Sequence, residues 1–259
     1  MAVIAVANQK GGVGKTTTAV NIAVCLYSLG QKVLLCDLDS QGHVAVALGV
    51  SVGESDPTIL DLMRGSKPVE AVRRVYREDE KGALHIWPSA IDLSTLDQEF
   101  AGKPSGYFLL REAIAGVRES YDFVVIDCPP FLGLATTNAL AAADCYLVPV
   151  NPGLLSLDGI KNLEASAAEI KRYLNDRLFC LGVVLTKADA RTKLTKETID
   201  VLKEAYEDLL FEEIIFERVR YANAVSDGVP IEPVEDEPYM RLTKEVVNRV
   251  KVVGHEKSA

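Results

Sequence analysis

Short apolar runs alternate with helical patterns along the whole chain. The apolar, β-branched runs predict strands at Val3–Ala7, Val33–Asp37, Leu84–Pro88, Phe123–Asp127, Cys145–Val150, Cys180–Thr186 and Glu213–Phe216. Between them, the spacing of apolar positions predicts helices at Lys15–Leu29, Tyr107–Glu119, Leu134–Ala142, Leu155–Leu174 and Thr195–Leu210, with a last helix near Glu235–Val250. Most of the strands are continuously apolar, as expected when both faces are covered. The alternation predicts an α/β fold, a doubly wound, mostly parallel sheet with helices on both faces.

The chain shows no sign of division into several domains. Residues 51–82 are the most polar and irregular stretch and are expected to form a surface excursion between strands. No internal repeat, low-complexity tract or long Pro/Gly/Ser linker interrupts the pattern. We therefore expect a single domain over residues 1–259, at the upper end of domain size.

Composition and charge point to a cytoplasmic protein. The N-terminal segment is too short and lacks the basic flank of a signal peptide, and polar residues interrupt the longest apolar stretch, Leu132–Val150. The five cysteines are scattered singly, which indicates buried thiols in a reducing compartment. The net charge of −9 argues against a protein that coats nucleic acid with its whole surface, although a local basic patch is compatible with it.

A glycine-rich segment lies between the first predicted strand and the first predicted helix. Glycines let the backbone wrap closely around phosphates, and the helix N-terminus that follows attracts the same anion. In this P-loop pattern Lys15 would reach the β- and γ-phosphates and the Thr16 hydroxyl would bind Mg²⁺. The predicted phosphate-binding residues are Lys10, Gly11, Gly12, Val13, Gly14, Lys15, Thr16 and Thr17.

Carboxylates end two of the predicted strands. Asp37 and Asp39 stand two residues apart at a strand end, where a parallel sheet binds its ligand. Asp127 ends the apolar run Val124-Val125-Ile126 and fits a Walker B aspartate, close to Mg²⁺ and acting through bound water. The Pro-Pro pair that follows it suits a loop that senses the γ-phosphate.

The segment Lys-Gly-Gly-Val-Gly-Lys-Thr-Thr at residues 10–17 resembles the deviant Walker A motif of the ParA/MinD family of ATPases. Residues 37–42 resemble the family's Asp-x-Asp-Pro-Gln-Gly segment, with Ser40 in place of the usual proline. The resemblance extends over nearly the whole chain and favours the ParA/Soj branch. It implies ATP and Mg²⁺ as cofactors, and catalytic roles for Lys10 across a homodimer interface, for Lys15, and for Asp39 in positioning water. The implied metal site comprises Thr16, Asp39 and Asp127.

The segment after the sixth predicted strand leaves the choice of base open. Thr186-Lys187-Ala188-Asp189 matches the Thr-Lys-x-Asp signature of related GTPases, whose aspartate pairs with guanine. The overlapping Asp189-Ala190-Arg191-Thr192 matches a segment of ParA proteins letter for letter. The longer resemblance favours ATP.

The resemblance also implies partners. Short ParA proteins bind DNA non-specifically in the ATP state, and a ParB-like, cargo-bound protein stimulates hydrolysis, so a nucleoid-associated location is expected. Arg191 and Arg220 resemble the family's DNA-contacting arginines, but residues 191–220 hold six basic and eight acidic side chains, so solvated helix faces remain an alternative. The C-terminal segment lacks the Phe, Trp or Leu of a membrane-inserting helix, so no stable membrane attachment is expected.

Two functions of different classes follow from these residues. The first is an ATPase that partitions or positions a plasmid, a chromosome region or another cargo. The second is a P-loop enzyme that uses ATP or GTP to act on a small-molecule substrate. The whole-chain resemblance and the lack of an obvious acceptor-binding insertion favour the first.

Overall fold

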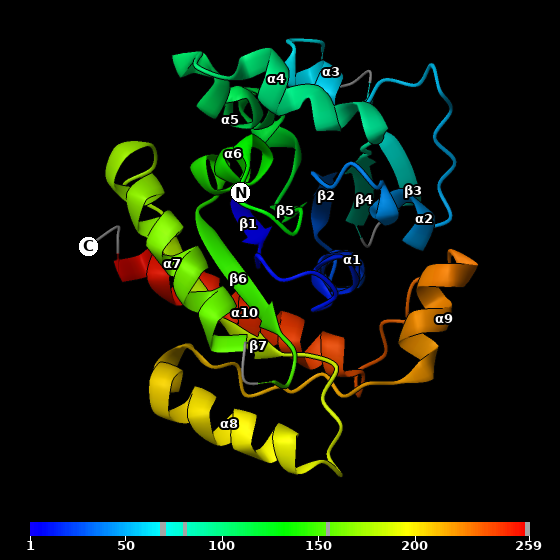
Figure 1. Ribbon diagram of the computed structural model, residues 1–259. Helices are drawn as coiled ribbons and strands as arrows, with labels where there is room; N and C mark the ends of the chain where they lie inside the picture. Colours follow the sequence, from blue (N-terminus) through cyan, green and yellow to red (C-terminus); the bar gives the residue numbers. More distant parts are fainter. Residues whose placement is uncertain (68–70, 80–81, 154–155, 257–259) are drawn as a thin grey trace.

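The computed structural model describes residues 1–67, 71–79, 82–153 and 156–256. A seven-stranded sheet with the order β3-β4-β2-β5-β1-β6-β7 forms its centre (Figure 1). Six strands are parallel and β3 is antiparallel to β4, so the predicted doubly wound, mostly parallel sheet is confirmed. The strands are β1 (Ala2–Val6), β2 (Lys32–Asp37), β3 (Arg73–Asp79), β4 (Gly82–Trp87), β5 (Phe123–Asp127), β6 (Cys145–Val150) and β7 (Phe179–Leu185).

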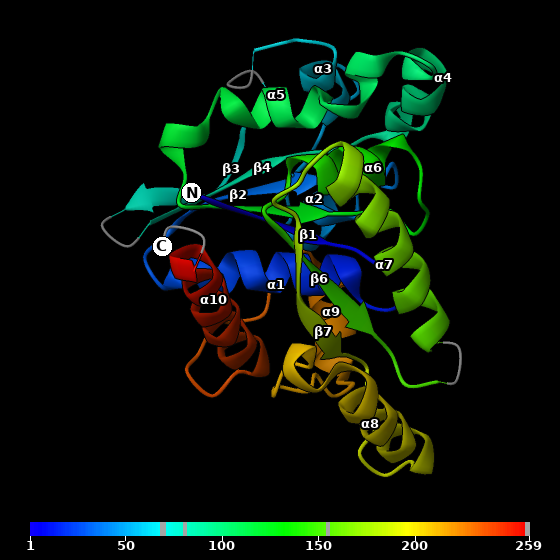
Figure 2. The ribbon, with the colours of Figure 1, turned by 90° about the vertical axis from the view of Figure 1, so that its left-hand side faces the viewer.

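Helices cover both faces of the sheet, as Figure 2 shows. They are α1 (Lys15–Ser28), α2 (His43–Ala47), α3 (Ile59–Met63), α4 (Leu96–Phe100), α5 (Leu109–Ala115), α6 (Leu134–Ala142), α7 (Ser156–Tyr173), α8 (Lys193–Tyr206), α9 (Val219–Asp227) and α10 (Pro238–Glu256). Because side chains alternate along a strand, Val3 and Ala5 of β1 pack into one core with α3 to α8, whereas Ile4 and Val6 pack into the other with α1, α2, α9 and α10. The alternating burial explains why the strands are apolar throughout.

The strand β3 corrects the expectation for residues 51–82. Arg73–Asp79 pairs antiparallel with β4 at the edge of the sheet, within the stretch that was expected to be irregular. Its sequence, Arg-Arg-Val-Tyr-Arg-Glu-Asp, is mostly charged. Charged side chains are common on edge strands because they discourage pairing with other chains, and they also remove the apolar signal that identifies a strand.

The strand predicted at Glu213–Phe216 is absent, and this prediction was wrong. The segment after α8 follows the free edge of β7 through two isolated bridges, Val183 with Leu210 and Ala188 with Phe216. Between them, the Glu212 N–H donates to the Glu245 carboxylate at 3.2 Å and not to β7. The Phe211 and Ile215 N–H groups do donate to β7, to the carbonyls of Val183 and Leu185 at 2.9 Å. These bonds are four residues apart on this segment but two residues apart on β7, so the pairing is not a continuous ladder.

The helix predicted at Tyr107–Glu119 is shorter than expected. Leu109–Ala115 is α-helical, and single 3₁₀ turns at Pro104–Tyr107 and Arg118–Ser120 flank it. Gly116, which has low helix propensity, stands at the end of the α-helical part. Within the described ranges, no helix combines the length and apolarity needed to cross a bilayer.

Candidate nucleotide-binding site

The site lies at the carboxyl ends of three neighbouring strands. In the parallel register, Val6 of β1 and Asp37 of β2 both pair with Asp127 of β5. The strand order therefore brings the glycine-rich loop after β1 together with the two carboxylates. This edge of an open α/β sheet is where such folds bind ligands.

The loop between β1 and α1 has the conformation that its glycines allow. Gly12 and Gly14 have φ of +74° and +83°, values that side-chain-bearing residues rarely adopt, and α1 begins directly after Gly14. The Thr186 hydroxyl at the end of β7 donates to the carbonyls of Val13 (2.7 Å) and Val150 (3.0 Å). The loop is therefore fixed to the sheet and not only to its own helix.

Asn8 holds the start of the same loop. Its Nδ2 donates to the Pro149 carbonyl at 2.8 Å, and its Oδ1 accepts the Lys10 N–H at 2.9 Å. A methyl group built on Gly159 of α7 would lie only 3.0 Å from Asn8 Oδ1. A glycine at that position lets α7 approach the loop closely.

Lys15 points back across its own loop. Its Nζ donates to the Lys10 carbonyl at 3.1 Å, and its side chain is buried. Burial lowers the pKa of the Lys15 ammonium, while the carboxylates of Asp127 and Asp39 act in the opposite direction. An anion in the loop would favour the charged form of this lysine.

Two carboxylates at this edge of the sheet, those of Asp37 and Asp127, are fully buried. Neither oxygen of Asp127 accepts a hydrogen bond from the residues that the structure describes. Burial raises the pKa of Asp127 to about 7, although the nearby Thr16 hydroxyl and Lys15 lower it. Burial and the neighbouring Asp127 also raise the pKa of Asp37. Unsatisfied buried carboxylate oxygens are suitable partners for a hydrated divalent cation.

The turn that carries Asp39 is held by Asp37. The Asp39 N–H donates to Asp37 Oδ1 at 3.0 Å, and the Val44 N–H donates to Asp37 Oδ2 at 3.1 Å. Asp39 Oδ1 in turn accepts the Gln41 N–H at 3.1 Å. Asp37 thus holds both ends of residues 39–44 and sets the position of Asp39 at the mouth of the site.

A cleft of about 450 Å³ opens above the loop. It is lined by Gly11, Gly12, Gly14, Lys15, Thr16, Thr17, Asp39, Gln41, His43, Pro130 and Lys187. No group of three or more His, Cys, Asp or Glu side chains that could hold a metal forms in the described part of the chain. Mg²⁺ is usually held by one or two protein oxygens together with phosphates and water.

A second cavity of about 270 Å³ adjoins the cleft at Gly14, Thr17 and Lys187. Ile215, Phe216 and Tyr239 add apolar surface, which suits a nucleobase. Asp189, the residue that would select guanine, does not line this cavity. Its carboxylate receives two hydrogen bonds from the Arg191 guanidinium, at 2.9 and 2.8 Å, which lower its pKa to about 2.

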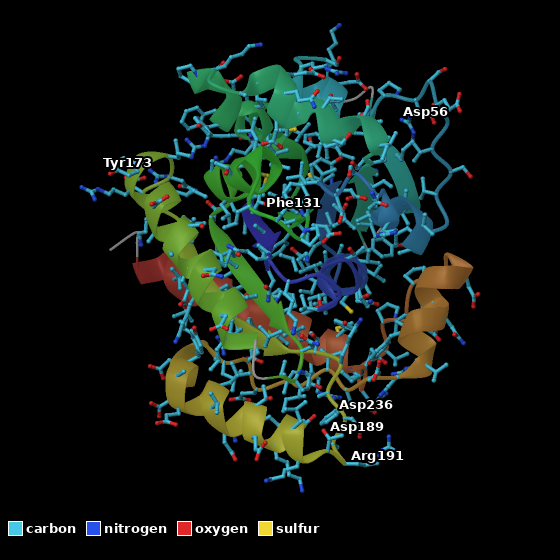
Figure 3. All side chains as sticks on the ribbon, in the orientation of Figure 1. Asp56, Phe131, Tyr173, Asp189, Arg191 and Asp236 are labelled. Carbon is cyan, nitrogen blue, oxygen red and sulfur yellow. The ribbon has the colours of Figure 1, made fainter. Side chains whose placement is uncertain are left out.

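The two predicted DNA-contacting arginines lie on different elements. Arg191 precedes α8 at the periphery of the molecule (Figure 3), and its side chain is 89% exposed. Arg220 on α9 is 48% exposed and pairs with Glu237, which is buried and also accepts the Tyr221 hydroxyl at 2.7 Å. Several further basic residues are paired with acidic ones: Lys193 with Glu197, Arg241 with Glu213, Lys244 with Glu235 and Arg249 with Glu245.

Comparison with known proteins identifies the family. The family described as AAA domain matches residues 1–180. The chromosome-partitioning ATPase Soj of Thermus thermophilus is 40% identical over 253 residues, which cover 96% of each chain. The chain belongs to the ParA/Soj family of P-loop ATPases. The sporulation initiation inhibitor protein Soj of Bacillus subtilis is 35% identical over 249 residues, 94% of this ParA/Soj chain and 97% of its own.

Solved structures resemble this ParA/Soj ATPase over its whole length. An ATP complex of McdA from Cyanothece superposes with a TM-score of 0.84 at 25% identity, covering 97% of this chain and 96% of that one. Cobyrinic acid a,c-diamide synthase from Mycobacterium smegmatis, with a bound ATP analogue and magnesium, gives a TM-score of 0.81 at 28% identity over the same shares. Both proteins were crystallised with a nucleotide of the kind that the loop predicts.

Three residues that hold parts of the site in place in this ParA/Soj ATPase were not recognised from the sequence. Asn8 and Thr186 hold the phosphate-binding loop, and Asp37 holds the Asp39 turn. Thr186 acts on a carbonyl 173 residues away, so no local pattern reveals it. The spacing of Asp37 and Asp39 marked that segment as part of the site. It did not show that Asp37 holds the turn while Asp39 lines the cleft.

Proposed function

We propose that this chain is a partition or positioning ATPase that binds ATP with Mg²⁺ and dimerises around it. The ATP-bound dimer binds DNA non-specifically, and a cargo-bound, ParB-like protein stimulates a weak intrinsic hydrolysis. The relatives named chromosome partitioning protein ParA and chromosome-partitioning ATPase Soj support this function, as does the ATP bound in the McdA complex. In this proposal Lys15 and Thr16 hold the phosphates and the cation, Asp127 acts through bound water, and Asp39 positions the attacking water.

The position of Lys10 carries the proposal. Among the described residues that line the cleft, Lys15 is present and Lys10 is not. Lys10 uses its backbone within the loop, donating to Asn8 and accepting from Lys15, while no described carboxylate pairs with its ammonium. Its Cβ lies near α7, 3.9 Å from a methyl group built on Gly159. A lysine that stands beside its own cleft without lining it is suited to a nucleotide bound by a second copy of the chain.

Exposed apolar residues beside the cleft support an interface there. Phe131 and Leu132, in the loop after β5, are 53% and 39% exposed. Figure 3 shows Phe131 at the end of β5. Pro130 of the same loop lies beside the phosphate-binding loop, because a methyl group built on Gly11 would be 4.0 Å from Pro130 Cβ. Burial of these side chains against a partner would add apolar area to the contact of Lys10 with phosphate. Nucleotide state and dimer contact would then involve the same loop.

Binding of DNA would depend on Arg191 and Arg220. Dimerisation would complete the cationic surface by adding the same arginines of a second copy. The chain is acidic overall, and many basic side chains are paired internally. One copy alone therefore presents little net positive charge to phosphates. Joining two copies in the ATP state would double the number of exposed arginines facing DNA, which explains an ATP requirement.

The similarity to cobyrinic acid a,c-diamide synthase supports a second candidate function, that of a P-loop enzyme acting on a small molecule. The partition relatives are more similar in sequence, at 33–40% identity against 28%. The two functions differ in what stimulates turnover. Hydrolysis that rises with DNA and a ParB-like partner, with no acceptor present, distinguishes the first from the second.

The decisive experiment is light scattering on a variant that retains ATP. Asp39→Ala should bind ATP and form a stable dimer, and Lys10→Ala combined with Asp39→Ala should stay monomeric with its ATP bound. Lys171→Ala combined with Asp39→Ala is the matched control, since Lys171 is exposed on α7 and should leave the dimer intact. A stable dimer of the Lys10→Ala, Asp39→Ala variant would refute the bridging role of Lys10.

A further inference from the structure

Lys187 occupies the junction between the phosphate cleft and the adjoining apolar cavity. Gly14, Thr17 and Lys187 line both spaces, and of these only Lys187 carries a charge. A methyl group built on Gly14 would lie 4.0 Å from Lys187 Cε, so the lysine stem runs alongside the phosphate-binding loop. The side chain is exposed, and the structure gives its ammonium no partner among the described residues.

The backbone at this position is unusual in a way that points to function. Lys187 has φ of +51° and is the one non-glycine residue with positive φ among those described. This left-handed conformation favours glycine, and strained positions of this kind cluster at ligand sites. The strain is maintained by neighbours on both sides, because Thr186 is bonded to Val13 and Val150 and the Ala188 N–H donates to Ile215.

We infer that Lys187 is a nucleotide-contacting residue that binds the segment joining the phosphates to the base. A ligand that fills both spaces must pass this junction, and in a nucleotide the passing segment is the sugar with its first phosphate. The lysine stem offers apolar surface to the sugar and its ammonium offers a charge-assisted contact to the phosphate. This inference rests on nucleotide binding, which the proposed function also requires.

The assignment separates Lys187 from the other lysines of the site. Lys15 begins α1 and its side chain crosses the loop, where it would meet the terminal phosphates, and Lys10 does not line the cleft. Lys187 would instead contact a part that ATP and ADP share. Its loss should therefore weaken the binding of both nucleotides equally, which is expected of a contact to a part that they share.

Calorimetric titration with ADP and with a non-hydrolysable ATP analogue, each with Mg²⁺, tests the assignment. Lys187→Met removes the charge and keeps most of the stem, and Lys187→Gly also relieves the backbone strain. We expect both variants to bind each nucleotide about ten-fold more weakly, the effect of one contact to a charged group. Lys196→Ala, an exposed lysine of α8 away from both cavities, should bind as the wild type does.

Thermal unfolding without nucleotide supplies the readout that separates binding from structure. Lys187→Gly should melt at or above the wild-type temperature while binding more weakly, which a purely structural lysine would not do. Wild-type affinity in both variants, or a loss confined to the ATP analogue, would overturn the assignment while leaving the proposed function intact. A wild-type chain that binds neither nucleotide would overturn both.

Discussion

Replacing Asp127 with Asn should stabilise the ligand-free protein while impairing its site. Burial raises the pKa of Asp127 to about 7, against an ordinary value of 3.8. A raised folded-state pKa contributes stability that is fully present below pH 4 and is lost as the pH rises through 7. With about 1.4 kcal/mol per pKa unit, this difference destabilises the folded state by about 4 kcal/mol at pH 8, where the carboxyl must ionise in its buried site. At pH 5 the destabilisation is only about 2 kcal/mol, because the folded carboxyl keeps its proton and only the unfolded chain ionises it. The neutral amide of Asp127→Asn avoids this cost.

Urea denaturation at both pH values, without nucleotide or Mg²⁺, measures the effect. The free energy of unfolding of Asp127→Asn should exceed that of the wild type by up to about 4 kcal/mol at pH 8, with the gain shrinking markedly at pH 5. Asp200→Asn, the same exchange at an exposed position of α8, should change it by less than about 0.5 kcal/mol at either pH. A gain that does not depend on pH, or a loss of stability at pH 8, would refute this reasoning.

Three further predictions concern the proposed roles of site residues. Asp39→Ala should bind ATP as the wild type does but release phosphate at least ~100-fold more slowly, and unchanged turnover would remove Asp39 from the mechanism. Arg191→Ala and Arg220→Ala should each weaken DNA binding and its salt dependence in the ATP state, and equal binding with ATP, ADP or no nucleotide would contradict the switch. Arg220→Ala should also destabilise the fold by about 1–3 kcal/mol because it removes the cation beside buried Glu237, whereas Arg191→Ala should not. ATP should bind more tightly than GTP in a calorimetric titration because Arg191 occupies the Asp189 carboxylate, and the reverse order would show that this pair opens for guanine.

The sequence predicted the sheet wherever burial left an apolar signal. The buried strands β1, β2, β5 and β6 lie within a residue or two of their predicted bounds. The edge strand β3 was missed because five of its seven residues at Arg73–Asp79 are Arg, Glu or Asp, so the segment carries little apolar signal. Glu213–Phe216 was mistaken for a strand because its apolar residues pack into the core, although the segment pairs with β7 only discontinuously.

The candidate site was predictable as far as its chemistry is local. Gly12 and Gly14 adopt the positive φ values that the glycine-rich loop implies, and Asp127 lies where a strand-ending carboxylate was expected. The order of the strands, which sets Asp37 beside Asp127, is a tertiary property that no local pattern contains. The same holds for Thr186, whose hydroxyl bonds to Val13 across the sheet.

The ionisable groups of the site explain why anion and cation should bind together. Burial lowers the pKa of Lys15 and raises those of Asp37 and Asp127, so without ligand each is held in an environment that opposes its charge. A phosphate alone would favour the charged form of Lys15 but would add negative charge beside three carboxylates, counting Asp39. A divalent cation alone would relieve the carboxylates but would oppose the ammonium. A phosphate chain that carries its own Mg²⁺ stabilises the Lys15 ammonium and the carboxylates at the same time. The free energy of binding therefore includes relief of the unfavourable burial of these charges in the empty site. The buried charges that make this site unfavourable when empty are the same ones that make its affinity depend on both parts of the ligand.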